Sequence, residues 1–241
     1  MSENSRRKAS FPPWGLMSVI MTPSVAHLVR YVLNRLFLQE LVPCIPVMPG
    51  TDDIAYLRAI VSYAASFSAC SFEFAAIWLI LKRNKLSFRY LGSWKLDRGI
   101  GWAVLIGIGL GVFGNIWTTL CLHPGHLYSV LYLPAYFLTK LRMMYITLVV
   151  IVGVLVAPFA EELLFRGLAY CLLRRKLNTA MSVLLLSIGF VLCHINIYKH
   201  PGLTLHIFLL SVVVSLFYEK RRSIIGCIII HLISNAIVLP A

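Results

Sequence analysis

Polar residues interrupt three otherwise apolar stretches of this sequence, and their types suit the hydrolysis of a bond. They are Glu161, Glu162 and Arg166 in the first stretch, His194 in the second, and His231 with Asn235 in the third. A carboxylate can act as a general base, and a histidine can share the proton that the base takes. Neutral or cationic donors can stabilise a developing oxyanion. The three stretches therefore supply the parts of a hydrolytic site.

The spacing of the first group fits a helix. Glu162 and Arg166 are four residues apart, so on a helix they share a face and can pair. Glu161 points about 100° away from Glu162 and can face a cavity. Pro158 lacks an N–H, which leaves the carbonyl of Val154 without its helical partner and predicts a bend one turn before the carboxylates. The alternative is an interfacial Glu/Arg pair that ends a membrane span.

The other two groups also have helical spacing. Phe190 and His194 are four residues apart, and so are His231 and Asn235. A single histidine on an apolar helix can equally be a packing residue, and an intramembrane asparagine can hold helices together. Charges in lipid cost about 2.5–3.5 kcal/mol each on insertion scales, which favours a functional reason for the whole set. Four more polar residues lack companions at helical spacing and are interpreted as packing or interfacial residues: His27, Glu73, Asn115 and His206.

No serine or cysteine nucleophile is clearly paired with these groups. Cys193 adjoins His194, but neighbours in a helix point about 100° apart. A water molecule activated by Glu161 is the simpler interpretation. The sequence has no H-E-x-x-H motif, and its six cysteines show no metal-type spacing, so we expect no metal or other cofactor. Zinc bound by Glu161, His194 and His231 stays open as an alternative.

The composition indicates the kind of molecule that must position these residues. Of the 241 residues, 59% are hydrophobic and 13% are charged, and the mean hydropathy is +0.83. A soluble domain carries roughly a quarter charged residues, so a soluble enzyme and a disordered chain are excluded. The net charge of +13 does not indicate binding to nucleic acid, because the basic residues form short clusters between apolar runs. We predict an all-α, polytopic helical bundle that is integral to a membrane.

About seven transmembrane helices are predicted, with six to eight possible. The ranges are Leu16–Leu38, Ile54–Leu81, Ile100–Leu122, Met143 through Ala160 toward Leu173, Ala180–Tyr198, Leu203–Tyr218 and Ile224–Leu239. The stretch Leu127–Leu138 contains Pro134 and is too short to span, so a half-helix on the outer face is expected there. We divide the chain into an N-terminal transmembrane region of about three spans, residues 1–142, and a C-terminal catalytic core, residues 143–241.

Clusters of basic residues occur at every second connection between these spans. They are Arg6–Lys8, Lys82–Lys85 with Arg89, Lys95 and Arg98, then Arg174–Lys176, and Lys220–Arg222. Loops rich in Lys and Arg stay on the cytoplasmic side. The pattern predicts a cytoplasmic N-terminus and a C-terminus on the outer side.

The three polar groups together resemble the motifs of a known family. Glu161-Glu162-x-x-x-Arg166, Phe190-x-x-x-His194 and His231-x-x-x-Asn235, in this order and on separate membrane helices, are similar to the motifs of the CAAX protease and bacteriocin-processing family, also called the ABI family, of glutamate-type intramembrane endopeptidases. The resemblance covers roughly residues 143–235. It implies that Glu161 and His194 activate the attacking water, that His231 and Asn235 stabilise the oxyanion, and that Glu162 and Arg166 support the site structurally.

The expected function is therefore an intramembrane endopeptidase that cleaves a membrane-bound or lipid-modified peptide or protein. A CAAX prenyl endopeptidase is one alternative, and a non-catalytic bacteriocin self-immunity or membrane scaffold protein is another. The expected partners are this substrate and the lipid bilayer, and no nucleic acid; the sequence predicts no oligomeric state. The third motif lies close to Ala241, which favours a compact bacterial family member, so we expect a multi-pass protein of the bacterial cytoplasmic membrane.

Overall fold

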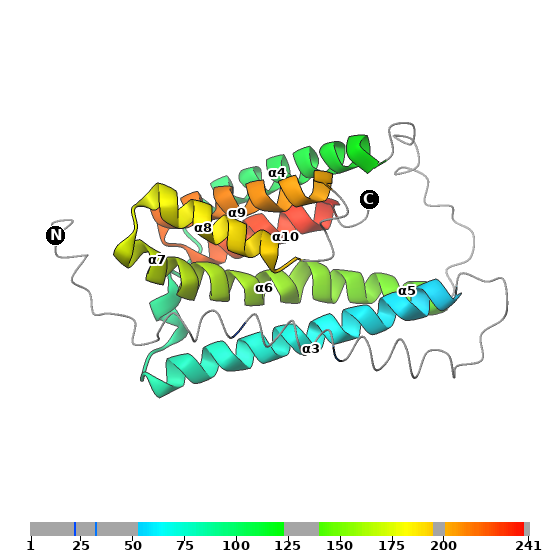
Figure 1. Cartoon of the computed structure of the whole chain (residues 1–241), viewed down its shortest axis with the longest axis horizontal. Coiled ribbons are helices and arrows are strands. Elements are labelled where there is room, and N and C mark those ends of the chain that lie inside the picture. Colours follow the sequence, from blue (N-terminus) through cyan, green and yellow to red (C-terminus); the bar gives the residue numbers. More distant parts are fainter. Residues whose placement is uncertain (1–21, 23–31, 33–52, 123–139, 195–200, 239–241) are drawn as a thin grey trace.

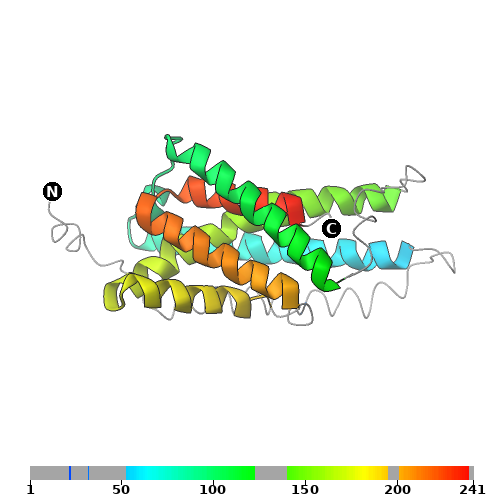
Figure 2. The ribbon, with the colours of Figure 1, turned by 90° about the horizontal axis from the view of Figure 1, so that it is seen from above.

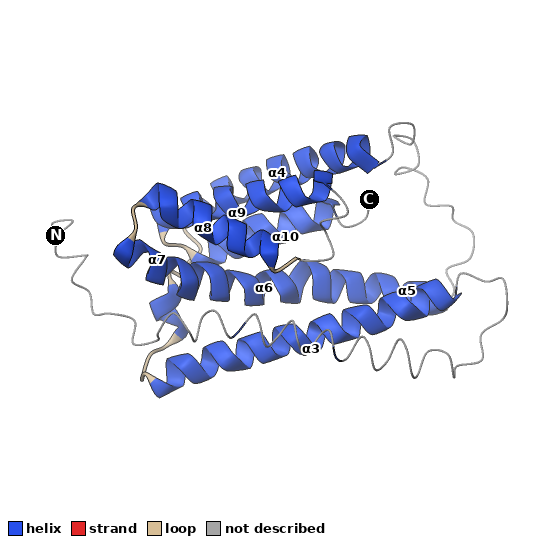
Figure 3. Ribbon diagram, in the orientation of Figure 1, coloured by secondary structure: helices blue, strands red, loops and turns tan. Residues whose placement is uncertain are grey.

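The computed structural model describes residues 53–122, 140–194 and 201–238, together with the single residues Thr22 and Val32. The regular elements in these ranges are helices (Figure 3). They run along the long axis of one bundle (Figure 1), and α4 runs beside α9 and crosses α10 obliquely (Figure 2). The prediction of an all-α membrane bundle is confirmed. The predicted first span and the predicted half-helix at 127–138 fall outside the described residues.

The chain order of the elements is simple. It is α3 (Asp53–Arg83), the short 3₁₀ turn η3 (Phe88–Leu91), α4 (Gly99–Leu122), α5 (Lys140–Leu148), η5 (Val149–Val156), α6 (Ala157–Glu162), η6 (Leu163–Tyr170), α7 (Cys171–Lys176), α8 (Thr179–Leu192), α9 (Pro201–Arg221) and α10 (Ile224–Val238). Elements α5 to α7 follow one another without a break, and η5 and η6 are π-helical stretches within this long helix.

Four described helices are long and apolar enough to cross a membrane. Their spans are Ile60–Arg83, Gly99–Thr118, Met144–Lys176 and Pro201–Arg221, and two shorter apolar helices are Thr179–Leu192 and Ile224–Val238. Six of the predicted spans thus correspond to described helices. The 33 residues of Met144–Lys176 would measure roughly 50 Å as a regular helix, against about 30 Å of hydrocarbon, so this helix tilts or extends beyond the lipid.

Helix α4 shows what surrounds the bundle. Many of its large apolar side chains are exposed, among them Trp102 at 60%, Leu105 at 62% and Leu120 at 53%. In water such a contiguous apolar face would cause association, whereas lipid tails solvate it. The opposite side of α4 packs on α9 and α10. Element α4 is therefore a helix at the edge of the bundle with one face toward lipid.

The core lies where η6 meets α8, α9 and α10. Leu163, Leu168, Val214, Ile224 and Ile230 are all fully buried there. Because η6 is the part of the long helix that is enclosed on most sides, charged residues on it are removed from both water and lipid. This enclosure decides how Glu162 and Arg166 must be stabilised.

The long helix changes its hydrogen-bond register just before the carboxylates. The N–H of Ala157 bonds the carbonyl of Val152, five residues back. In that wider register the carbonyl opposite the nitrogen of Pro158, which has no N–H to donate, is that of Gly153.

Candidate active site

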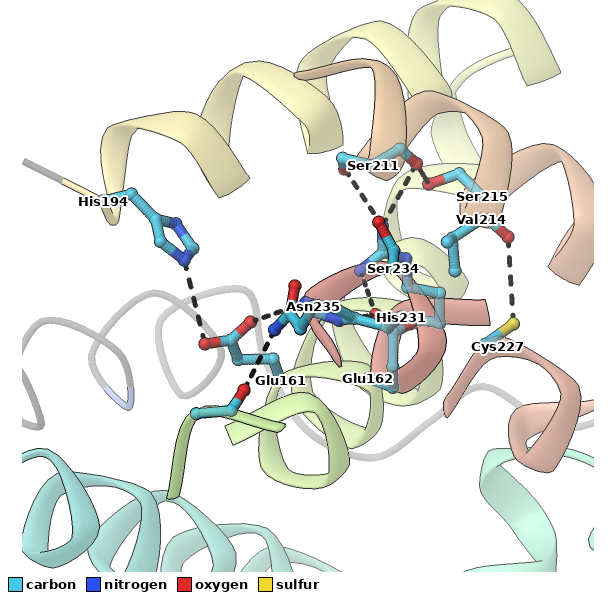
Figure 4. Close-up of polar contacts among 12 residues, drawn as sticks. Glu161, Glu162, His194, Ser211, Val214, Ser215, Cys227, His231, Ser234 and Asn235 are labelled. Carbon is cyan, nitrogen blue, oxygen red and sulfur yellow. Dashed lines mark hydrogen bonds and ion pairs between the residues drawn. The ribbon is translucent and has the colours of Figure 1, made fainter. Parts of the chain in front are cut away.

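Four elements of the C-terminal part bring the predicted polar residues into one region of the bundle (Figure 4). Their positions are Glu161 and Glu162 at the end of α6, Arg166 in η6, His194 two residues after α8, and His231 and Asn235 in α10. Residues that are up to 74 positions apart in the chain thus meet around the end of α6. The convergence that the spacing predicts is present.

Glu161 lies between two imidazole rings. Its Oε1 is 3.8 Å from His194 Nε2, and its Oε2 is 3.8 Å from His231 Nε2. These distances are those of ion pairs rather than of direct hydrogen bonds. The Glu161 side chain is 20% exposed, which agrees with a carboxylate that faces a cavity. Each of its two oxygens therefore faces a different imidazole.

Glu162 and Arg166 form the predicted pair one helical turn apart. Arg166 Nη1 donates to Glu162 Oε1 at 2.8 Å, and both side chains are completely buried. Arg166 Nη2 also donates to the carbonyl and the hydroxyl of Ser211, each at 3.1 Å. The guanidinium lies over the ring of Phe190, 5.0 Å from the ring centroid. Arg166 thereby links the long helix to α8 and α9.

Glu162 also contacts His231 of α10 directly. His231 Nδ1 is 2.8 Å from Glu162 Oε1, the same oxygen that accepts from Arg166. Because a carboxylate only accepts, Nδ1 of His231 carries hydrogen. His194 Nδ1 likewise lies 2.7 Å from the carbonyl oxygen of Phe190, so its Nδ1 carries hydrogen as well. These acceptors assign the ring orientation of both histidines and direct both Nε2 atoms toward Glu161.

Asn235 also makes a hydrogen bond that the family resemblance did not lead us to expect. Its Nδ2 donates to the carbonyl of Gly153 at 3.0 Å, which is the carbonyl opposite Pro158 in the π-helical register. The proline therefore frees an acceptor, and α10 supplies the donor that satisfies it. An amide nitrogen carries two hydrogens, so the second one remains for a negatively charged oxygen.

A cavity of about 290 Å³ adjoins these groups. Its wall includes Glu161, His194, His231 and Asn235. One water molecule in the liquid occupies about 30 Å³, so the cavity has room for several water molecules or a small group of a ligand. The opposite wall comes from one face of α3, with Tyr63, Ser66, Ala69, Cys70 and Glu73.

Two residues of the cavity wall were not recognised as part of the site from the sequence. His206 and Glu73, both interpreted there as packing or interfacial residues, are buried and line the cavity. His206 Nε2 lies 3.3 Å from the hydroxyl of Ser234. Neither residue belongs to the three groups of polar residues at helical spacing, so the motif pattern did not reveal them. The signal that was available is an ionisable residue within an apolar span.

No group of three or more His, Cys, Asp and Glu side chains in the described ranges is placed to hold a metal ion. In this arrangement the Nδ1 atoms of His194 and His231 bond a carbonyl and a carboxylate, and both Nε2 atoms face Glu161. The polar contacts drawn in Figure 4 join these side chains to one another. The zinc alternative stays a prediction that chelators can test.

Comparison with known proteins gives a match, and it covers the part of the chain that contains the predicted site residues. No curated protein and no solved structure matches the chain. The family model described as type II CAAX prenyl endopeptidase, Rce1-like, matches residues 143–237. This range contains all six predicted site residues and begins where the predicted catalytic core begins. Residues 143–237 are thus similar to this family, in agreement with the resemblance drawn from the three motifs, and the match supports an intramembrane endopeptidase at the family level.

Proposed function

We propose that this protein hydrolyses a peptide bond of a membrane-associated or lipid-modified substrate with a water molecule activated by Glu161. One observation carries the proposal: Glu161 directs one oxygen toward each of two imidazoles, at 3.8 Å, on the wall of a cavity within a membrane bundle. A carboxylate with two imidazoles on the wall of a cavity has no evident purpose in helix packing. It suits general acid and base chemistry.

In the proposed reaction Glu161 takes a proton from the water while His194 shares it. The Phe190 carbonyl orients His194 so that Nε2 faces the carboxylate. The water oxygen then attacks the peptide carbonyl. His231 and Asn235 donate hydrogen bonds to the negative charge that develops on the carbonyl oxygen. The Glu162–Arg166 pair holds this arrangement, because it ties the long helix to α8, α9 and α10.

The proposal is tested with the purified full chain in liposomes and a library of membrane-anchored peptides, read by mass spectrometry. We expect Glu161→Gln, His194→Ala and His231→Ala each to lower the cleavage rate by about 10²–10⁴. Asp97→Asn is the matched control, because Asp97 is exposed and caps Gly99 N–H at the far end of α4. Wild-type rates in all three site variants would reject proteolysis at this site. Strong inhibition by chelators, reversed by zinc, would reject water activation by glutamate alone.

A CAAX prenyl endopeptidase is the second candidate, and the description of the matching family favours it. Such an enzyme would cleave close to a prenylated cysteine near a C-terminus. The test compares one peptide with and without its prenyl group. A requirement for prenyl identifies this narrower activity, and equal cleavage of both forms rejects it.

The competing function without catalysis is bacteriocin self-immunity or a membrane scaffold. It would need the polar residues only for packing. Glu161→Gln keeps the shape and hydrogen-bonding capacity of the side chain but removes its charge and basicity. Protection or signalling that survives this substitution would favour the competing function.

We also propose a bacterial cytoplasmic membrane as the location, with the N-terminus in the cytoplasm. The basic clusters support this orientation. Three of the described clusters, Lys82–Lys85, Arg174–Lys176 and Lys220–Arg222, lie at the C-terminal ends of α3, α7 and α9, and these ends lie at the same end of the bundle (Figure 1). Such a one-sided distribution is typical of the cytoplasmic side.

A further inference from the structure

The two histidines beside Glu161 differ in the group that faces their Nδ1 atoms. His231 Nδ1 faces the carboxylate of Glu162 at 2.8 Å, whereas His194 Nδ1 faces the uncharged carbonyl of Phe190 at 2.7 Å. The His231 side chain is 4% exposed and that of His194 is 23% exposed. A carboxylate behind an imidazole fixes its tautomer and stabilises the imidazolium that forms during hydrolysis. The two rings are therefore not equivalent proton carriers.

The charged groups around His231 also distinguish it from His194. Glu162 and Arg166 form a fully buried ion pair whose charges cancel. Glu161 is therefore the carboxylate near His231 that no arginine pairs with in the contacts described above, and its Oε2 is 3.8 Å from His231 Nε2.

The proton count limits what a neutral His231 can do. Its Nδ1 hydrogen is committed to Glu162, so a neutral ring has only a lone pair at Nε2. Such a ring cannot donate to an oxyanion. His231 can act on the substrate only when Nε2 is also protonated, and that proton is then available for transfer.

From this asymmetry we infer that His231 is the general acid of the reaction, which gives its Nε2 proton to the leaving nitrogen, and that Glu162 is the positioning residue behind it. The inference rests on the proposed function and refines it. Water activation remains with Glu161 and His194, while departure of the amine depends on His231 and Glu162. His206 of α9 also lies beside α10, where its Nε2 is 3.3 Å from the hydroxyl of Ser234.

The steps balance. Glu161 takes one proton from water, and the remaining hydroxide oxygen forms a bond to the carbonyl carbon, whose oxygen becomes negative. When that oxygen reforms the double bond, the C–N bond breaks and its electron pair goes to nitrogen, which takes the proton from His231. The products are a carboxylic acid and an amine. The proton on Glu161 then passes to His231, which restores the starting state.

A comparison of two leaving groups tests this role. The probes are a membrane-anchored peptide amide and the ester of the same acyl sequence with p-nitrophenol, which leaves without needing a proton. We expect His231→Gln to lower kcat/KM for the amide about 10²–10³-fold more than for the ester. Asn235→Ala is the matched control. It removes an oxyanion donor that both substrates need, so both rates should fall by the same factor.

The positioning role of Glu162 must be tested with a variant that keeps the fold. Glu162→Gln alone is unsuitable, because it leaves Arg166 buried and unpaired. The double variant Glu162→Gln/Arg166→Met removes both charges, and the new amide oxygen can still accept from His231 Nδ1. We expect it to melt within a few degrees of wild type in detergent and to lower the amide-to-ester ratio by about tenfold. In ¹⁵N spectra of histidine-labelled full-length protein, we expect the share of His231 that carries two protons to fall in this variant.

The outcomes separate the two proposals. Equal losses on amide and ester in His231→Gln would overturn the acid role and leave the proposed proteolysis intact. An unchanged His231 spectrum in the double variant would overturn the positioning role of Glu162. Wild-type protein that cleaves neither substrate would reject the proposed function, and the acid role with it.

Discussion

At the scale of single residues, the site separates the side chains that can exchange protons from those that maintain the geometry. Glu161 is partly exposed to the cavity and makes no close hydrogen bond to either histidine. Glu162 and Arg166 are completely buried and are bonded at 2.8 Å. Adjacent carboxylates on one helix thus have different surroundings, because consecutive side chains point about 100° apart. The two carboxylates have the same chemical type, so the difference between a partly exposed Glu161 and a buried, paired Glu162 comes from their surroundings.

Removal of Arg166 should be costly to the fold. Arg166→Met leaves the charge of Glu162 buried with only His231 as a partner, and breaking a buried pair typically costs about 3–5 kcal/mol. We expect a corresponding loss in the free energy of unfolding in detergent, followed by circular dichroism. Replacement of both partners, as in Glu162→Gln/Arg166→Met, should restore most of the stability. A single variant as stable as wild type would show that the pair contributes little to the fold.

At the scale of elements, the π-helical stretch η5 is what allows Pro158 and Asn235 to cooperate. The register of five residues directs the carbonyl of Gly153 toward α10, where Asn235 Nδ2 binds it at 3.0 Å. An N–H at position 158 would compete for this carbonyl. Pro158→Ala should therefore weaken the link between α10 and the long helix.

For Pro158→Ala we expect a lower kcat with a nearly unchanged melting temperature, because a helical hydrogen bond replaces the one to Asn235. A loss of about tenfold in kcat corresponds to about 1.4 kcal/mol, which is the size of one hydrogen bond. The measurement is the cleavage rate of the membrane-anchored peptide beside a thermal melt. Unchanged kcat would show that the Gly153 contact does not position Asn235 for the reaction.

A close approach between α4 and α9 offers a second element-scale test. A Cβ atom at Gly114 would collide with the ring of His206, whereas a Cβ at Gly109 meets nothing within 4 Å. Gly114→Ala should displace His206, break its contact with Ser234 and lower both the melting temperature and activity. Gly109→Ala is the matched control on the same helix and should leave both unchanged. Equal behaviour of the two variants would contradict the close packing of α4 on α9.

The sequence was sufficient for some elements and insufficient for others, for physical reasons. Apolar length predicted α3, α4 and α9 almost to their ends, and i to i+4 spacing predicted the pairing of Glu162 with Arg166. It could not predict the contact between His231 and Glu162, which joins helices 69 positions apart. Nor could it predict η5, because a π-helical register depends on packing and on Pro158 together. His206 and Glu73 were missed because neither belongs to one of the three groups of polar residues at helical spacing from which the site was predicted.

At the scale of the whole molecule, the polar site and the basic end have separate relations to the membrane. Glu161 lies 13 residues before Arg174 and 17 after Met144, which are roughly 20 Å and 26 Å along a helix. The site therefore lies well inside the bundle and away from both ends. The lipid-facing sides of α3 and α4 carry large exposed apolar side chains. A substrate that is anchored in the membrane can reach this depth without leaving the lipid.

The orientation of the bundle can be tested with two cysteines. Native Cys121 is exposed near the C-terminal end of α4, and Lys176 is exposed at the end of α7, the end that carries the basic clusters. If basic loops are cytoplasmic, a membrane-impermeant maleimide should label Cys121 on intact cells and label Lys176→Cys only after permeabilisation. Each cysteine is tested alone, with Cys44 and the other native cysteines replaced by serine. Labelling of Lys176→Cys on intact cells would contradict the proposed orientation. It would place the end of the bundle that carries the basic clusters outside the cell.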